Sequence, residues 1–206
     1  MLFDLDRLRS TEASTDPFPH VIVERFLRPQ AFGPVHADLP DLPKGGSFPI
    51  SSIKLGPAAR DMIEELEGPA FRAAVAQKFN LDLSNAPCMT TLRGRSRDKD
   101  GRIHTDSTAK RVTILLYLNP SSGDWADHEG CLRLLRGPDQ LDDYVAEVPP
   151  TDGTLLVFPN GETAWHGHKP FVGRRYVVQM NYMAPDDSAR REIRRHKISA
   201  FLKRFT

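Results

Sequence analysis

The most continuous hydrophobic run in the chain is Arg111–Asn119, with the sequence RVTILLYLN. Because its nonpolar residues follow one another instead of alternating with polar ones, we expect a strand that is covered on both faces. Shorter runs occur from about residue 86 onward, and turn-forming dipeptides such as Asp152-Gly153 and Asn160-Gly161 separate them. The predicted strands cover residues 21–27, 88–92, 104–106, 111–119, 130–135, 144–148, 154–159 and 175–183. Many short strands with frequent turns are typical of an antiparallel sandwich or jelly roll.

Helical patterns precede this β-rich part of the sequence. Helices are predicted at residues 29–38, 58–66 and 68–79, and the last one places Phe71, Val75 and Phe79 four residues apart on one face. We interpret this stripe as core packing. Residues 1–16 are polar and predict a loose lead-in, whereas residues 39–57 are rich in Pro, Gly and Ser and predict a loop.

A further helix is predicted after residue 185, with an imperfect nonpolar face and a basic face. The basic face contains Arg190, Arg191, Arg194, Arg195, Lys197, Lys203 and Arg204. A solvent-exposed face of a packed helix is the favoured interpretation, and contact with an acidic partner or nucleic acid is the alternative. The chain is thus predicted to be mainly β with flanking helices, as a single domain over 1–206: helical and loop support (1–85), a β core (86–184) and a basic C-terminal helix (185–206).

Composition narrows the class of protein. A hydrophobic content of 39% is enough for a sizeable core, and a formal net charge of +1 gives no global case for binding nucleic acid or a membrane. Cys88 and Cys131 are expected to be free thiols in a reducing compartment. No hydrophobic run has the length of a membrane span, and the N-terminus has acidic residues where a signal peptide needs basic ones. We therefore predict a cytoplasmic protein.

The segment Arg93–Arg102 is unusually charged, with four arginines in ten residues. We interpret it mainly as a solvated loop, since its acidic residues dilute the positive field, and a phosphate or polyanion patch is the alternative. Together with the acidic loop Asp124–Glu129, it is a candidate for flanking a substrate groove.

His104 and Asp106 are candidate metal ligands, because residues two apart on a strand point to the same face. An H-x-D pair is a weak signal alone, and it needs a third ligand from a distant strand, for which His166 and His168 both qualify. Two histidines and one carboxylate suit non-haem Fe(II), because they leave coordination positions open. A 2-oxo acid cosubstrate also needs a cation for its remote carboxylate, and either Arg174 or Arg175 can face inward to supply it.

The order of these motifs resembles the Fe(II)/2-oxoglutarate-dependent dioxygenases, specifically the prolyl-4-hydroxylase-like branch. The matching motifs are His104-Thr105-Asp106, Tyr117-Leu118-Asn119, Gly130-Cys131-Leu132-Arg133, Gly153 to Phe158, and His166 followed nine residues later by Arg175. The resemblance spans about residues 86–184 and implies a double-stranded β-helix. One departure is Glu129, which stands where the family often has a second glycine before the Leu-Arg strand.

The resemblance also implies roles for individual residues. His104, Asp106 and His166 would bind Fe(II), and the His-to-Arg spacing favours His166 over His168 and Arg175 over Arg174. Arg175 and Tyr117 would bind 2-oxoglutarate, although a tyrosine at this position is equally compatible with core packing. The resemblance gives weaker support to three candidate substrate contacts, which are Arg93, His168 and Asn181.

The implied activity is hydroxylation of an unactivated C–H bond with O2, releasing succinate and CO2, with ascorbate as an accessory reductant. A prolyl residue in a peptide or protein is the family-level substrate, and small molecules are the alternative. Two other classes remain open: a non-catalytic, cupin-like jelly-roll module that binds a metal or ligand, and a zinc hydrolase with Glu162 as general base. The sequence does not specify an oligomeric state.

Overall fold

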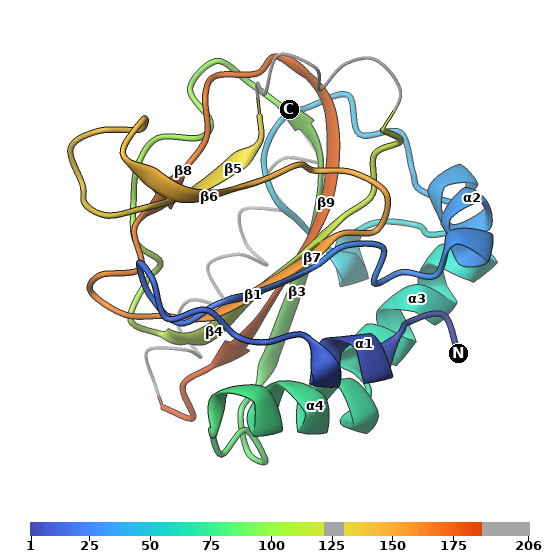
Figure 1. Ribbon diagram of the computed structural model, residues 1–206. Helices are drawn as coiled ribbons and strands as arrows, with labels where there is room; N and C mark the ends of the chain where they lie inside the picture. Colours follow the sequence, from blue (N-terminus) through green and yellow to red (C-terminus); the bar gives the residue numbers. More distant parts are fainter. Residues whose placement is uncertain (122–129, 187–206) are drawn as a thin grey trace.

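The computed structural model describes residues 1–121 and 130–186 of the chain, and their strands form two antiparallel sheets (Figure 1). The larger sheet has the strand order β1 (Val21–Val23), β7 (Leu155–Pro159), β4 (Lys110–Tyr117), β9 (Gly173–Met183), β3 (Cys88–Ser96) and β2 (Phe48–Pro49). The smaller sheet has the order β6 (Tyr144–Val148), β5 (Leu132–Leu135) and β8 (His166–Gly167). This arrangement is the predicted double-stranded β-helix, or jelly roll.

Helices cover the face of the large sheet that points away from the small sheet (Figure 1). They are α1 (Leu5–Ser10), α2 (Pro29–Ala37), α3 (Pro57–Glu67) and α4 (Pro69–Phe79), with a short 3-10 helix η1 (Ile50–Ser52). Proline at the first position starts α2, α3 and α4, because its missing N–H has no partner to lose there. The three longer helices confirm the helical predictions to within a residue or two.

Strand β4 shows why its sequence is continuously hydrophobic. It pairs with β7 on one side and β9 on the other, so it lies in the middle of the large sheet. Ile114 and Leu116 contact the helix layer, whereas Leu115 and Tyr117 belong to the cluster between the two sheets. The predicted coverage of both faces is therefore confirmed.

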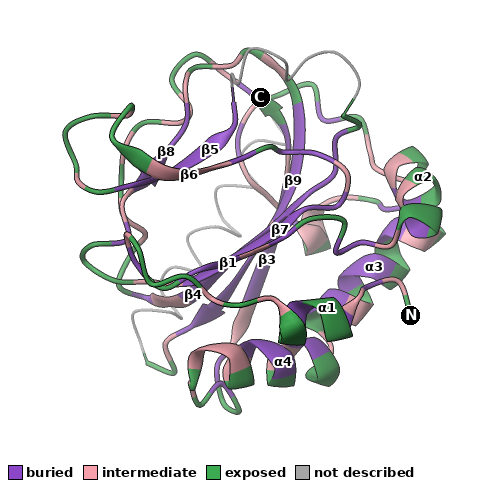
Figure 2. Ribbon diagram, viewed as in Figure 1, coloured by how far each residue is buried: buried purple, intermediate pink, exposed green. Residues whose placement is uncertain are grey.

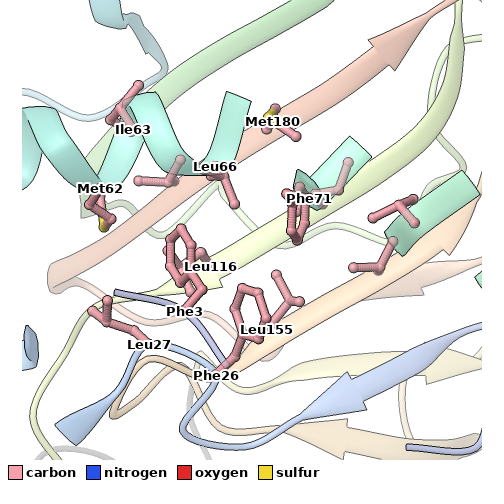
Figure 3. Close-up of a cluster of buried hydrophobic side chains, with 14 of the residues drawn as sticks. Phe3, Phe26, Leu27, Met62, Ile63, Leu66, Phe71, Leu116, Leu155 and Met180 are labelled. Atoms are coloured by element: carbon pink, nitrogen blue, oxygen red, sulfur yellow. The ribbon is translucent and has the colours of Figure 1, made fainter. Parts of the chain in front are cut away.

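The main hydrophobic core lies between the helices and the large sheet. Figure 3 shows Met62, Leu66 and Phe71 from the helices opposite Leu116 and Met180 from the sheet. Figure 2 shows the same division, with buried strands inside and exposed outer faces on the helices. The stripe predicted on α4 is part of this core: Phe71 and Val75 are buried, and Phe79 packs against them partly buried.

The prediction of a loose lead-in at residues 1–16 was wrong. Residues 5–10 form α1, and Phe3, Leu5 and Leu8 are buried in the main core. Phe3 stacks on Phe26 with ring centroids 4.7 Å apart. The surrounding polar residues conceal these three nonpolar side chains in the sequence, but their spacing is enough to anchor a short helix.

Several strand boundaries also differ from the prediction. The strand predicted at 21–27 ends at Val23, and β2 lies within the segment 39–57 that was predicted as a loop. Strand β3 continues through Ser96, so the first part of the predicted charged loop is strand. Residues 104–106 do not form a continuous strand, and His104 makes only an isolated bridge with His166. The turn residues that follow Asp106 break the ladder after this single pair.

Other predictions fall beyond the described residues. The basic helix predicted at 185–206 lies outside them, apart from residues 185 and 186, and the acidic loop 124–129 lies outside them as well. Cys88 and Cys131 are both free, as predicted. Within residues 1–121 and 130–186, no helix combines the length and the hydrophobicity that crossing a membrane requires.

Candidate active site

Two residues of the segment between β3 and β4 and one residue of β8 form a possible metal-binding group. One potential ligand atom from each of His104, Asp106 and His166 lies within 4.8 Å of the other two. The backbones of His104 and His166 exchange two hydrogen bonds, both 3.0 Å long, and their ring centroids are 4.3 Å apart. The isolated bridge therefore does what a continuous strand was expected to do, because it fixes the two imidazoles side by side.

The hydrogen bonds of the two imidazoles leave one nitrogen of each ring available. Nδ1 of His104 lies 2.8 Å from the carbonyl oxygen of Arg102, and Nδ1 of His166 lies 2.9 Å from that of Ala164. A carbonyl oxygen can only accept, so Nδ1 carries the hydrogen and Nε2 keeps its lone pair. Burial lowers the pKa of His166 to about 4, so this ring is neutral at physiological pH, as a metal ligand must be.

Asp106 is held by two side chains. Lys110 Nζ donates to Oδ1 over 2.6 Å, and the Thr113 hydroxyl donates to Oδ2. Burial raises the pKa of the Asp106 carboxyl, but the charge of Lys110, the electrostatic interaction with His166 and the two hydrogen bonds outweigh it, so the pKa lies below its usual value. Asp106 is therefore an oriented carboxylate. This donor set, two imidazole nitrogens and one carboxylate oxygen, fits Fe(II).

A cavity of about 280 Å³ opens beside His104 and His166. Alternate residues of two strands in the large sheet point into it, because side chains alternate between the two faces of a strand. These residues are Thr113, Leu115 and Tyr117 on β4 and Arg175, Val177 and Gln179 on β9. Leu132 and Gly167 belong to the small sheet and also line it. The cavity therefore lies between the two sheets of the jelly roll.

Arg175 and Tyr117 are buried side chains that line this cavity and could bind an anionic group. Arg175 is buried, its Nε donates to the Gly130 carbonyl oxygen over 2.9 Å, and no described carboxylate forms a salt bridge with it. Its Cζ lies 5.5 Å from the centroid of the Tyr117 ring, and the Tyr117 hydroxyl has no hydrogen-bond partner within the described chain. A buried guanidinium beside an unpaired hydroxyl fits the remote carboxylate of a 2-oxo acid. Arg174, in contrast, is exposed and contacts Asp41.

The structure separates the three candidate substrate contacts. Arg93 and His168 line the cavity, but Asn181 is not among its lining residues. Instead, the Asn181 side-chain amide lies 3.2 Å from the Thr113 hydroxyl, which donates its one hydrogen to Asp106, so Asn181 packs behind the hydroxyl that holds Asp106. His168 is packed against Gly101, whose φ of +92° and close approach to the imidazole leave no room for a Cβ.

Sequence reasoning missed several residues at this site. Lys110 and Thr113 orient Asp106, and Gln179 and Leu115 line the cavity. Alternation along β4 was the available signal for Thr113 and Leu115, because both share a face with Tyr117. Lys110 had no such signal, since its pairing with Asp106 depends on a turn. Glu162, the candidate general base of a zinc hydrolase, is exposed and does not line the cavity.

The fold and the site together define a class, the jelly-roll proteins with a possible metal-binding group beside a cavity between two sheets. Residues 94–183 match the family model described as the 2OG-Fe(II) oxygenase superfamily. This match, which covers a little under half of the chain, together with the His104, Asp106 and His166 group, supports a 2-oxoglutarate-dependent dioxygenase that uses Fe(II), 2-oxoglutarate and O2. A search of curated proteins finds no similar sequence.

Solved structures with the same fold include prolyl hydroxylases. A prolyl 4-hydroxylase from Phytophthora capsici is 16% identical, with a TM-score of 0.60 over 92% of this chain and 68% of that one. A prolyl-4-hydroxylase from Pseudomonas putida is 19% identical, with a TM-score of 0.50 over 87% and 90% of the two chains. A 2OG-Fe(II) oxygenase family protein from Burkholderia pseudomallei is 11% identical, with a TM-score of 0.54 over 87% and 90%. At these identities, the likeness concerns the fold.

Proposed function

We propose that His104, Asp106 and His166 bind the Fe(II) ion and that Arg175 and Tyr117 bind the remote carboxylate of 2-oxoglutarate. The observation that carries this proposal is the convergence of three ligand atoms within 4.8 Å beside a cavity that Arg175 also lines. A hydrolytic zinc site needs a general base but no buried arginine, so the same observation favours the oxygenase assignment of these residues.

When bound, Fe(II) with 2-oxoglutarate and O2 supplies the oxidising power that hydroxylates a C–H bond, with succinate and CO2 as coproducts. The chain's own groups prepare the site. Lys110 and Thr113 keep Asp106 ionised and oriented, and the backbone carbonyls of Arg102 and Ala164 fix the two imidazole tautomers. Leu115, Leu132 and Val177 make part of the cavity wall nonpolar, which limits water near the reacting carbon.

We further propose that the protein hydroxylates a peptide or protein at a prolyl residue. The support is the fold shared with the two prolyl hydroxylases, together with a cavity that opens to solvent through exposed residues of the 93–102 segment. Fold likeness alone is weak support for a substrate, so small molecules are the competing class. A cytoplasmic location, supported by two free cysteines, is part of the proposal and is testable by cell fractionation.

The first test is a titration of the metal-free protein with Mn(II) and then 2-oxoglutarate by calorimetry, followed by an assay for succinate with Fe(II), ascorbate and O2. Wild-type protein should bind 2-oxoglutarate only when metal is present and should form succinate slowly without substrate. Asp106→Ala should lose both signals, because it removes one of three ligands. Asp139→Asn, which changes an exposed carboxylate away from the cavity, is the matched control. Metal and 2-oxoglutarate binding without any turnover would favour the non-catalytic module.

A further inference from the structure

The cavity carries more positive charge than 2-oxoglutarate can neutralise. Besides Arg175, the described lining residues include four cations: Arg93, Arg95, Lys99 and Arg102. Asp100 is the one carboxylate among the described residues that line the cavity. All of these groups come from the charged segment that follows the middle of β3, on the side of the cavity nearest solvent.

Asp100 is already engaged by a residue outside the cavity lining. Its carboxylate accepts two hydrogen bonds from the Arg97 guanidinium, 2.9 and 3.1 Å long, and a third of 2.9 Å from the Arg97 backbone N–H. Arg93 Nη2 reaches the same carboxylate only at 3.8 Å. One carboxylate that is bound this closely by Arg97 leaves the four lining cations largely uncompensated.

Arg93 is the most informative of these cations because it is partly buried and poorly paired. Its one hydrogen bond within the described chain runs from Nη1 to the Ser47 hydroxyl at 3.4 Å, which is long. Burial works against its ionised form, the charge of Asp100 opposes this effect and that of Arg175 adds to it, and the net result is a lowered pKa for Arg93. In the β3–β9 ladder Arg93 is opposite Val177, two residues from Arg175, so its side chain lies one strand away from the 2-oxoglutarate position. Arg95, Lys99 and Arg102 have no side-chain hydrogen bond or ion pair with any described residue.

We propose that the substrate carries an anionic group, a carboxylate or a phosphate, which binds Arg93 on the cavity wall. Arg95, Lys99 and Arg102 attract this group at the entrance. The proposal rests on the proposed function, because it assigns Arg175 to 2-oxoglutarate and leaves Arg93 for the substrate. A guanidinium binds either anion through paired N–H groups, and burial makes such a pair strong.

The experiment uses the full chain with Fe(II) and 2-oxoglutarate, and it measures substrate-dependent succinate formation with matched pairs of compounds. The pairs are free amino acids and their carboxamides, phosphoserine and serine, and prolyl peptides with Glu or Gln beside the proline. At least one anionic member should have a kcat/KM about 10- to 100-fold above its neutral partner, the range expected for a charge-assisted hydrogen-bonded contact. The pair that responds identifies the source of the anion.

Arg93→Met should remove this preference, and its loss of kcat/KM for the anionic compound should exceed any change in the KM for 2-oxoglutarate. Arg93→Lys should restore part of the preference, because it keeps the charge without the paired geometry. Arg174→Met, which removes an exposed arginine outside the cavity, is the matched control and should change neither parameter.

Three outcomes would overturn the proposal: a neutral member that reacts as well as its anionic partner, no response to any anionic compound in protein that still forms succinate, or an Arg93→Met variant that weakens 2-oxoglutarate binding instead. Wild-type protein that binds no 2-oxoglutarate in the presence of metal is a different result. It would contradict the proposed function itself, and the substrate proposal with it.

Discussion

Arg175 and Tyr117 provide complementary donors at the residue scale. Arg175 has 7% of its surface exposed, and its guanidinium gives one described hydrogen bond, from Nε to Gly130. Burial raises the pKa of Tyr117 to about 12, so its hydroxyl stays protonated at neutral pH and can donate. A carboxylate at this position would meet a cation and a neutral donor together, and each should contribute differently to binding.

Arg175→Met should raise the Kd for 2-oxoglutarate about 10- to 100-fold, because hydrogen bonds to charged groups contribute roughly 1.5–3 kcal/mol. Tyr117→Phe should raise it less, about 2- to 10-fold, since it removes one hydroxyl donor. Calorimetry with Mn(II)-loaded protein measures both, and Arg174→Met is the control. Unchanged affinity in Arg175→Met would show that the cosubstrate binds elsewhere.

His168 makes stability depend on pH. Its ordinary pKa is 6.5, and burial, with the charge of Arg175 as the second cause, lowers it to about 4 in the folded protein. Between these values the unfolded chain binds one more proton than the folded chain, so the free energy of unfolding rises with pH. The slope should be about 1.4 kcal/mol per pH unit for one such histidine. His166 has a similar shift and adds to the effect.

His168→Gln should therefore reduce the slope of the free energy of unfolding against pH between about pH 4 and 6.5, by roughly the contribution of one titrating histidine. Urea denaturation of the metal-free protein at several pH values measures this slope. His36→Gln, which replaces a histidine on α2 that does not line the cavity, is the control. Equal slopes in wild type and His168→Gln would contradict the burial of a neutral imidazole at this position.

At the scale of elements, the N-terminal segment is a structural part of the helix layer. Glu65 of α3 accepts hydrogen bonds from the backbone N–H groups of Leu2 and Phe3, 2.7 and 3.1 Å long. Lys78 of α4 donates to the carbonyl oxygens of Arg9 and Thr11, both at 2.7 Å. These contacts fix both ends of α1, a helix too short to be stable alone.

Leu8→Ala should lower the free energy of unfolding by about 2–5 kcal/mol, because it leaves a cavity beneath α1. Chemical denaturation measures the loss, and Arg7→Ala, on the exposed side of the same helix, should change stability by less than about 0.5 kcal/mol. A small effect of Leu8→Ala would mean that α1 separates from the core independently. Metal binding should survive in either variant, since the site is on the other side of the large sheet.

At the scale of the whole molecule, the site exists only when the two sheets are assembled. His166 belongs to β8 of the small sheet, Arg175 to β9 of the large sheet, and His104 to the segment between β3 and β4. The unfolded chain cannot bring these groups together. Metal and 2-oxoglutarate should therefore bind the folded state selectively and stabilise it.

Saturating Mn(II) and 2-oxoglutarate should raise the free energy of unfolding, by about 2.7 kcal/mol for each ligand present at 100 times its Kd. Thermal denaturation with and without a chelator measures the change as a shift in Tm. Asp106→Asn should lose most of the metal-dependent shift, and Asp139→Asn should keep it. A wild-type Tm that does not respond to metal would argue against a preformed site.

The predictability of the fold differs between its parts. The strand at the centre of the large sheet and helices α2 to α4 follow from local patterns, because long runs and proline-initiated helices are strong signals. Helix α1 does not, since three nonpolar residues among polar ones become a core segment only when another layer covers them. The boundary of β3 was missed for a related reason: charged residues can continue a strand where its side chains line a polar cavity.

The site shows the same division. The residue types and their order along the chain were sufficient to propose the resemblance to the oxygenases and to select three candidate ligands that the structure brings together, because that chemistry needs two imidazoles, a carboxylate and a cation in a fixed sequence of strands. Only the tertiary structure decided that an isolated bridge, not a strand, joins His104 to His166, that Lys110 and Thr113 hold Asp106, and that Asn181 lies behind it. The physical reason is that His104 and His166, like Thr113 and Asn181, are far apart in sequence and meet only when the strands pack. Lys110 and Thr113 are near Asp106 in sequence, but they reach it only through the turn that leads into β4, which no local preference specifies.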